Sequence, residues 1–213
     1  MNKNDTILIN KNDINQFKTP NNIIKKLKKL LIRLIKILDM LNIKWWADSG
    51  TLLGLIRHKS IIPWDDDIDL GILFSDEYKI YNNFDLFEKN NLRIRKNRTG
   101  VYWQIDRLSH DKKLNDIHID LFLYKYNVSS DKVSSDKILY NTDPRFSMPD
   151  IESGHCNMYY KYDDLFPLIK KKFYNFDINC PKNYDKILTN CIGKDYLETI
   201  IIKKNNKVYK VSN

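Results

Sequence analysis

Long apolar runs and paired cysteines are absent from this sequence. No apolar run approaches the roughly 18 residues that a membrane-spanning helix needs, and the N-terminus has no apolar signal core followed by a small-residue cleavage site. The three cysteines, Cys156, Cys180 and Cys191, are odd in number and form no Cys-x-x-Cys pair. We therefore expect neither a disulfide framework nor a structural zinc site. We expect a soluble protein of the cytoplasm or another reducing compartment, without a transmembrane segment.

Internal repeats and linker-like stretches are also missing, which favours a single domain. The 213 residues, of which 42% are hydrophobic, suffice for one core. Residues 1–18 are polar and rich in Asn and Lys, so we predict a poorly ordered segment before a domain spanning 19–213. The net charge of +9 suits phosphate-bearing partners, but Lys, Asn and Ile are abundant throughout, as an AT-rich genome would impose. No nucleic-acid-binding motif accompanies the charge, so no nucleic-acid partner is expected.

The first long element is predicted as a helix over 20–41, with Thr19 as its N-cap and Pro20 in its first turn. Its apolar residues form one stripe: Ile23, Ile24, Leu27, Leu30, Leu31, Leu34, Ile35 and Leu38. Basic residues lie mostly off that stripe. A basic amphipathic helix can lie on an anionic membrane surface, so peripheral membrane association stays open. We predict instead that the leucine stripe packs into the core.

The stretch 45–73, WWADSGTLLGLIRHKSIIPWDDDIDLGIL, concentrates the candidate chemistry. IKWWAD predicts a short strand, SGTLLGLIRH a turn entering a helix, and DDDIDLGIL a second strand. Asp67 and Asp69 are two residues apart and share one strand face, where two carboxylates repel unless a cation lies between them. Hard oxygen ligands at this spacing suit Mg²⁺ or Mn²⁺. Such a metal usually holds a substrate phosphate, to which the turn at 49–51 offers backbone N–H groups and a positive helix end.

Further strands and helices are predicted downstream. Residues 92–97 and 101–108 predict a hairpin, 116–124 a central strand, and KKKFYNFDINCP a short strand pair before a final helix. A loop is predicted for 126–148, either a lid over an acceptor site or a variable insertion. A helix is expected at 76–90, with its aromatic residues in the core rather than forming a base-stacking platform: Tyr78, Tyr81, Phe84 and Phe87.

The hairpin and the central strand contain three residues that could belong to a functional site. The hairpin is basic, and such a charge run is usually a solvated face, but Arg107 ends a strand that leads toward the next carboxylate. That carboxylate is Asp120, in the alternating segment DIHIDLFLY; a His-x-Asp alone is a weak signal, because a lone Asp often caps or pairs. His118 shares the strand face of Asp120. It is either a partner of Asp120 or a histidine with its own hydrogen bonds, and we favour the second interpretation.

The motif DSGTLLGLIRHKSIIPWDDDID resembles the signature of the LicD/fukutin family within the nucleotidyltransferase superfamily. The resemblance extends over residues 23–198 and includes the later segments DDLFPL, PKNYDKIL and IGKD. One departure is minor: the family usually has Tyr-Gly where this chain has Ile192-Gly193. The resemblance implies an α/β fold, a nucleotidyltransferase-like small mixed sheet flanked by helices in a single domain, with the site at the sheet edge.

The resemblance also implies an activity: a transferase that moves phosphocholine or a polyol phosphate from a CDP-linked donor to a hydroxyl of a sugar or glycan acceptor. Asp67 and Asp69 would hold Mg²⁺ or Mn²⁺ at the donor phosphates, and Asp120 would complete the metal site or take the proton of the attacking hydroxyl. Asp65 and Asp66 are expected to have loop or supporting roles. The residues expected to bind substrate are Ser49, Gly50, Thr51, Arg57 and Arg107. Arg57 is included because a planar guanidinium suits a phosphate.

Other functions stay open at this point. A nucleotidyltransferase proper would attack the α-phosphate of a nucleoside triphosphate and release pyrophosphate, whereas the transferase above would release CMP. A folded but inactive relative would bind a nucleotide or a glycan without turnover. The intact Asp67, Asp69 and Asp120 argue against this last alternative.

Overall fold

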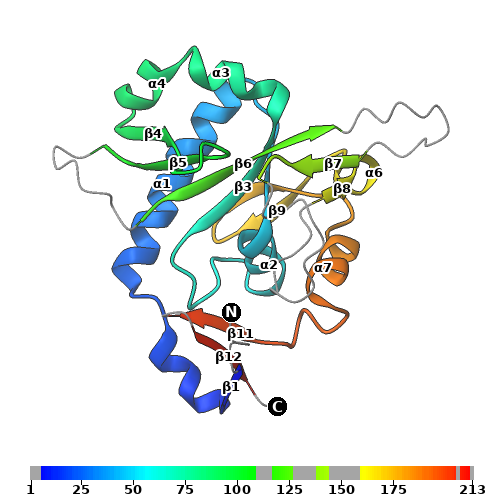
Figure 1. The fold of residues 1–213 in the computed structure, drawn as a ribbon. Helices are drawn as coiled ribbons and strands as arrows, with labels where there is room; N and C mark the ends of the chain where they lie inside the picture. Colours follow the sequence, from blue (N-terminus) through cyan, green and yellow to red (C-terminus); the bar gives the residue numbers. More distant parts are fainter. Residues whose placement is uncertain (1–5, 109–116, 127–137, 144–158, 205–206, 212–213) are drawn as a thin grey trace.

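The structure describes residues 6–108, 117–126, 138–143, 159–204 and 207–211 of the computed structural model, and these parts contain both strands and helices (Figure 1). The largest sheet has seven strands. They are β2 (Trp45–Ala47), β3 (Ile68–Leu73), β4 (Leu92–Lys96), β5 (Trp103–Arg107), β6 (Ile119–Tyr126), β7 (Ile138–Asn141) and β8 (Tyr159–Lys161). The order is β2-β3-β6-β5-β4; in addition, β7 pairs with β6, and β8 pairs with β7. Only β3 and β6 pair in parallel within this sheet, so the predicted mixed α/β sheet and its central strand are confirmed.

Helix α1 (Asn21–Met40) forms because apolar residues recur every three or four positions along it. The leucines of its stripe are buried in the core, as predicted: Leu27, Leu30, Leu34 and Leu38. Each buried leucine contributes about 1.5–3 kcal/mol relative to an exposed one. Of the helices in the described ranges, none has the length and apolar character needed to cross a membrane.

Helix α2 (Ser49–Arg57) connects β2 to the loop that enters β3. Two glycines allow the close packing around it. A Cβ on Gly54 would lie 2.6 Å from the carbonyl oxygen of Ser60, and a Cβ on Gly71 of β3 would overlap the Trp46 ring. Ordinary Cβ atoms do not approach other atoms so closely, so glycine is required at both positions.

The predicted helix at 76–90 is interrupted. It consists of a short 3₁₀ turn, η2 (Phe74–Asp76), followed by α3 (Glu77–Tyr81) and α4 (Phe84–Lys89). Phe87 is buried, but Tyr78 and Tyr81 are 60% and 50% exposed and Phe84 is also exposed, so the prediction of an aromatic core is wrong for three of the four residues. The predicted hairpin is confirmed as β4 and β5.

The two ends of the chain meet in a separate three-stranded sheet. β1 (Thr6–Ile9) pairs in parallel with β12 (Lys207–Val211), which pairs in antiparallel fashion with β11 (Ile201–Lys204). A 3₁₀ helix, η1 (Lys11–Phe17), follows β1. The predicted lack of order in the N-terminal segment is therefore corrected from Thr6 onward, because these residues pair with the distant C-terminal strand. Residues 1–5 lie outside the described ranges.

The segment before the C-terminal sheet contains the predicted strand pair and final helix. β9 (Ile169–Phe173) pairs with β10 (Phe176–Cys180), after the short helix α6 (Tyr162–Leu165) and before α7 (Tyr184–Ile192). Cys180 is a buried free thiol, whereas Cys191 is disulfide-bonded, which departs from the expectation of reduced cysteines throughout. β7 falls within the predicted loop 126–148, most of which lies outside the described residues.

Candidate active site

Two carboxylates on neighbouring strands lie near the middle of the large sheet. Asp69 on β3 and Asp120 on β6 are direct partners in the parallel pair. Both side chains therefore leave the same face, from strands about 4.8 Å apart. Asp120 is buried and Asp69 is half-buried. The two residues come together as the sequence predicts, but on interior strands, near their N-terminal ends, rather than at an edge strand of the sheet.

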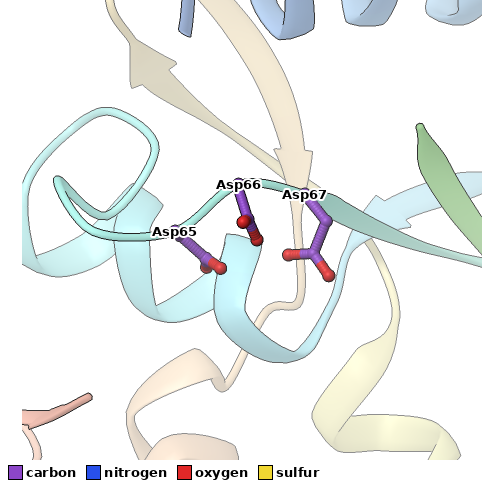
Figure 2. Close-up of side chains that lie close together, drawn as sticks. All are labelled: Asp65, Asp66 and Asp67. Atoms are coloured by element: carbon purple, nitrogen blue, oxygen red, sulfur yellow. The ribbon is translucent and has the colours of Figure 1, made fainter. Parts of the chain in front are cut away.

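A second acidic group precedes β3. One oxygen from each of Asp65, Asp66 and Asp67 lies within 4.8 Å of the others, a grouping that could hold a metal ion. Figure 2 shows these three side chains on the loop that enters the strand. Asp66 is exposed and the other two are half-buried. Asp65 and Asp66, for which the sequence predicts only loop or supporting roles, thus contribute oxygens to this group.

The N-terminal end of α2 faces the carboxylates. A Cβ on Gly50 would lie 3.0 Å from Oδ2 of Asp65, which is tighter than usual, and 3.6 Å from Oδ2 of Asp69, which is ordinary contact, so both carboxylates adjoin this glycine. Ser49, the preceding residue, has a φ of +42°, in the left-handed region that non-glycine residues rarely adopt. The turn at 49–51 therefore lies beside the acidic residues, where the sequence predicts it.

Two hydrogen bonds join this turn to β3. The Asp48 backbone N–H donates to the carbonyl of Asp69 at 3.1 Å, and the Asp69 N–H donates to Oγ1 of Thr51 at 2.8 Å. Thr51 is buried, so its hydroxyl fixes the position of Asp69 relative to α2. The threonine predicted to bind substrate thus has a clear contact with the strand that carries a candidate ligand.

A buried cluster that the sequence did not predict surrounds Asp48, the N-cap residue of α2. Its carboxylate accepts hydrogen bonds from the Tyr124 hydroxyl at 2.6 Å, from the Tyr160 hydroxyl, and from the Ser49 backbone at 2.8 Å. Burial raises the pKa of Asp48, while these bonds lower it. Tyr124 shares the strand face of Asp120 on β6, a signal that could have revealed it. No local signal points to Tyr160.

The grouped carboxylates raise one another's pKa. Burial, followed by the charges of Asp67, Asp65 and Asp120, raises the pKa of Asp69 well above its usual range. Burial and the Asp67 charge do the same to the pKa of Asp65. Burial also raises the pKa of Asp120 to about 6. Each ionised carboxylate costs free energy beside the others, and a divalent cation would offset that cost.

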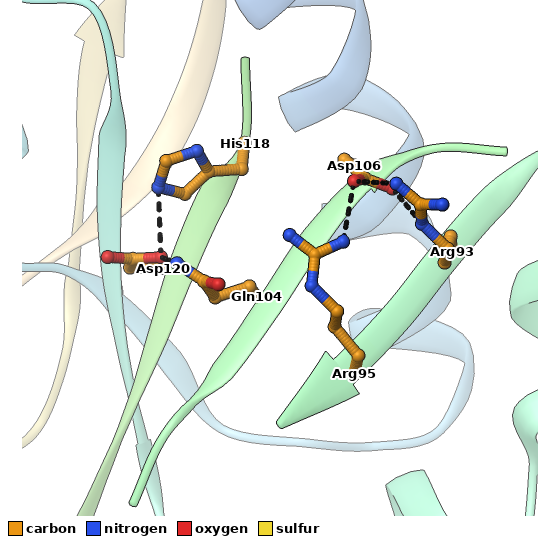
Figure 3. Close-up of polar contacts among 6 residues, drawn as sticks. All are labelled: Arg93, Arg95, Gln104, Asp106, His118 and Asp120. Carbon is orange, nitrogen blue, oxygen red and sulfur yellow. Dashed lines mark hydrogen bonds and ion pairs between the residues drawn. The ribbon is translucent and has the colours of Figure 1, made fainter. Parts of the chain in front are cut away.

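Asp120 has polar partners on its own sheet face (Figure 3). Gln104 Nε2 donates to its Oδ1 at 3.1 Å, and His118 Nε2 lies 3.4 Å from the same oxygen. His118 Nδ1 is buried and has no hydrogen-bond partner. The prediction that His118 satisfies its own hydrogen bonds is therefore wrong, and the alternative, a partner of Asp120, holds.

The two arginines predicted to bind substrate lie elsewhere. Arg57 is at the C-terminal end of α2, about 10 Å along the helix from Gly50. Its Nη1 donates to the backbone carbonyls of Tyr196 at 3.3 Å and Thr199 at 2.9 Å, which ties α2 to the C-terminal segment. Arg107 is exposed at the end of β5, and strand alternation points it to the face opposite Asp120.

The arginines on the carboxylate face are instead Arg93 and Arg95 of β4. Arg93 donates to both oxygens of the fully buried Asp106, with its Nε 2.9 Å from Oδ1 and its Nη2 2.6 Å from Oδ2. Arg95 Nη1 lies 2.8 Å from Oδ2 of the same carboxylate. The prediction of a solvated face for this basic run is therefore wrong for these two arginines. The alternation of Arg93 and Arg95 with apolar residues was the available signal.

The family of the chain follows from comparison with known proteins. The family model described as LicD/FKTN/FKRP, nucleotidyltransferase domain, matches residues 42–183, more than half of the chain. These residues include the α2 turn and all the carboxylates described above. The chain belongs to this family.

Individual relatives match over shorter lengths. An uncharacterized protein of Rickettsia typhi is 31% identical over 68% of this chain and 38% of its own length. Ribitol 5-phosphate transferase FKRP of Homo sapiens is 38% identical over 27% of this chain and 12% of its length. Lipopolysaccharide cholinephosphotransferase LicD of Haemophilus influenzae is 54% identical over 17% of this chain and 14% of its length. The matches thus span well under half of these relatives.

One solved structure shows a weak likeness to the chain. The crystal structure of ANT(2'')-Ia in complex with adenylyl-2''-tobramycin aligns with 72% of this chain and 67% of its own chain, at 12% identity and a TM-score of 0.38. A likeness this low supports no inference about fold or function.

Proposed function

We propose that the protein is a metal-dependent transferase with a nucleotidyltransferase-like fold. It moves a phospho-substituent, of the phosphocholine or polyol phosphate type, from a CDP-linked donor to a hydroxyl of a glycan acceptor. The observation that carries the proposal is the set of carboxylates beside Gly50 at the start of α2. The transferred group follows from family membership, since relatives are named as ribitol 5-phosphate and choline phosphate transferases.

The acidic residues fit a divalent cation. Asp67, Asp69 and Asp120 would hold Mg²⁺ or Mn²⁺, with Asp65 as a further oxygen donor, because hard carboxylate ligands suit these ions. The raised pKa of Asp69 and Asp65 supports this assignment, since like charges are gathered there. When bound, such an ion would offset the negative charge of the donor phosphates.

The chain's own groups would perform the remaining steps. The turn at the start of α2 would offer the Gly50 backbone N–H and the positive end of the helix to a donor phosphate. As the alternative to holding the ion, Asp120 would accept the proton of the attacking hydroxyl, a role that suits its pKa of about 6 in the metal-free protein. Gln104 and His118 would orient that carboxylate. Substrate binding by Arg57 and Arg107 stays a prediction, and the proposed mechanism does not depend on it.

The test is an assay of CMP release. The protein would be incubated with CDP-choline or CDP-ribitol, a panel of sugar acceptors, and either Mn²⁺ or a chelator. We expect CMP and a phosphodiester product with one donor, and no product with chelator. Release of pyrophosphate from a nucleoside triphosphate in place of CMP would instead assign the protein to nucleotidyl transfer. Activity unchanged by chelator would contradict the proposed metal dependence.

A further inference from the structure

One row of side chains crosses four neighbouring strands of the large sheet. Asp69 on β3 is the partner of Asp120 on β6, Asp120 of Gln104 on β5, and Gln104 of Arg95 on β4. Register partners point to the same sheet face, and each strand step is about 4.8 Å, so the Arg95 backbone lies roughly 14 Å from that of Asp69. The row is therefore acidic at one end and basic at the other.

At the basic end of the row, two arginines share a single carboxylate. Asp106 supplies one negative charge, and Arg93 already donates to both of its oxygens. Arg95 adds a second positive charge to the same carboxylate through Nη1. The group of Arg93, Arg95 and Asp106 thus has a net charge of +1, and both arginines are half-buried. An anion from outside the chain would balance this charge.

Arg95 also has an unused donor. Its Nη2 is buried and has no hydrogen-bond partner. The side chain as a whole is 27% exposed, so it lies close to the protein surface. Figure 3 shows this guanidinium between Asp106 and the Gln104–Asp120 pair, held in place by its bond to Asp106. An orphaned donor on a fixed, planar cation suits an oxyanion that enters from outside the chain.

We propose that Arg95 forms an oxyanion subsite that binds a phosphate group of a substrate, on the same sheet face as the carboxylates that would hold the metal. The chemical class is a phosphate ester, either the phosphate chain of the donor or a phosphate carried by the acceptor. The subsite itself follows from the charges and donors described here, while its assignment to a transferase substrate rests on the proposed function. In that role Arg95 positions a substrate and takes no part in bond making.

The test is a titration with inorganic phosphate, followed by ³¹P NMR, in EDTA and again with Mg²⁺. We expect saturable binding that Arg95→Met weakens about tenfold or more, because a charge-assisted bond to phosphate is lost. Arg93 and Asp106 still pair in this variant, so it should fold, and circular dichroism would check this. Arg95→Lys keeps the charge and should retain part of the affinity.

Lys96→Met is the matched control. It removes the same charge from the next residue of β4, on the opposite face, where Lys96 pairs with Glu77. Phosphate affinity should stay unchanged. Absence of saturable phosphate binding in both buffers, or equal affinity of wild type and Arg95→Met, would overturn the subsite.

A second titration identifies the phosphate. With Mg²⁺ and saturating CDP-choline, displacement of bound phosphate assigns the subsite to the donor, and simultaneous binding assigns it to a phosphorylated acceptor. The EDTA titration contains neither metal nor donor. A protein that released no CMP but bound phosphate through Arg95 would therefore contradict the proposed function and leave the subsite standing.

Discussion

Asp120 and Asp106 lie on one face of the same sheet, both buried, and their surroundings differ in kind. Asp106 has two guanidinium partners within 2.8 Å, from arginines on the neighbouring strand. Asp120 has a glutamine, a histidine and, as its strand partner, the carboxylate of Asp69. Where a buried charge maintains structure, the chain supplies the counter-charge. Where carboxylates face one another without one, burial and mutual repulsion raise their pKa.

The largest expected effect is on catalysis. Asp69→Asn should lower turnover on the order of 10²–10³-fold, because Asn keeps the shape but loses the anion that offsets the cation. The free energy of unfolding without metal should hold or rise, since one of several repelling carboxylates is removed. CMP release and urea denaturation would measure the two quantities. Equal turnover of variant and wild type would remove Asp69 from the mechanism.

Asp106→Asn should mainly lower stability, whereas Asp69→Asn mainly lowers turnover. It leaves Arg93 and Arg95 without their carboxylate, which should lower the free energy of unfolding by about 2–3 kcal/mol; this is less than for fully buried pairs, because both arginines are partly exposed. Urea denaturation of wild type and variant, both without metal, would measure the loss. A variant as stable as wild type would show that this ion cluster is not what maintains the sheet.

The surroundings of Asp120 could largely be predicted from local sequence patterns. The glycine turn, the α1 stripe, the β4–β5 hairpin and Asp120 on a central strand all follow from periodicity or from a contiguous motif. The pairing of Arg93 and Arg95 with Asp106 was harder to see, because a charge run reads as a solvated face until the partner strand is known.

Contacts between distant segments could not be predicted. Tyr160 reaches Asp48 across 112 residues, and β1 pairs with a strand at the other end of the chain. Both contacts depend on how distant segments assemble in the fold, and a short stretch of sequence holds no information about that assembly. The exposure of Tyr78 and Tyr81 was missed for the same reason, since helical spacing indicates a shared face but not what covers it.

The smallest expected effect is on the pH dependence of stability. The folded-state pKa of Asp120 is raised to about 6 from an ordinary value of 3.8, so the folded state binds this proton more tightly than the unfolded state. The resulting stabilisation is present below about pH 4 and is lost as pH rises through about 6. Relative to Asp120→Asn, metal-free wild type should lose on the order of 1–2 kcal/mol between pH 4 and 7.

Urea denaturation of both proteins across this pH range would measure the difference. Added Mg²⁺ should restore stability to wild type at pH 7, because ligand binding to the folded state stabilises it by mass action. Parallel pH profiles of the two proteins would show that Asp120 does not titrate differently in the folded state.

Calorimetric titration of Mn²⁺ into chelator-treated protein tests most directly whether the unpaired carboxylates form a metal site. Wild type should bind Mn²⁺ saturably, and Asp69→Asn should bind it at least about tenfold more weakly, since a ligand charge is lost. Asp106→Asn, which removes an equally negative residue from the same face, should bind like wild type. No saturable binding by wild type, or equal loss of affinity in both variants, would contradict the account.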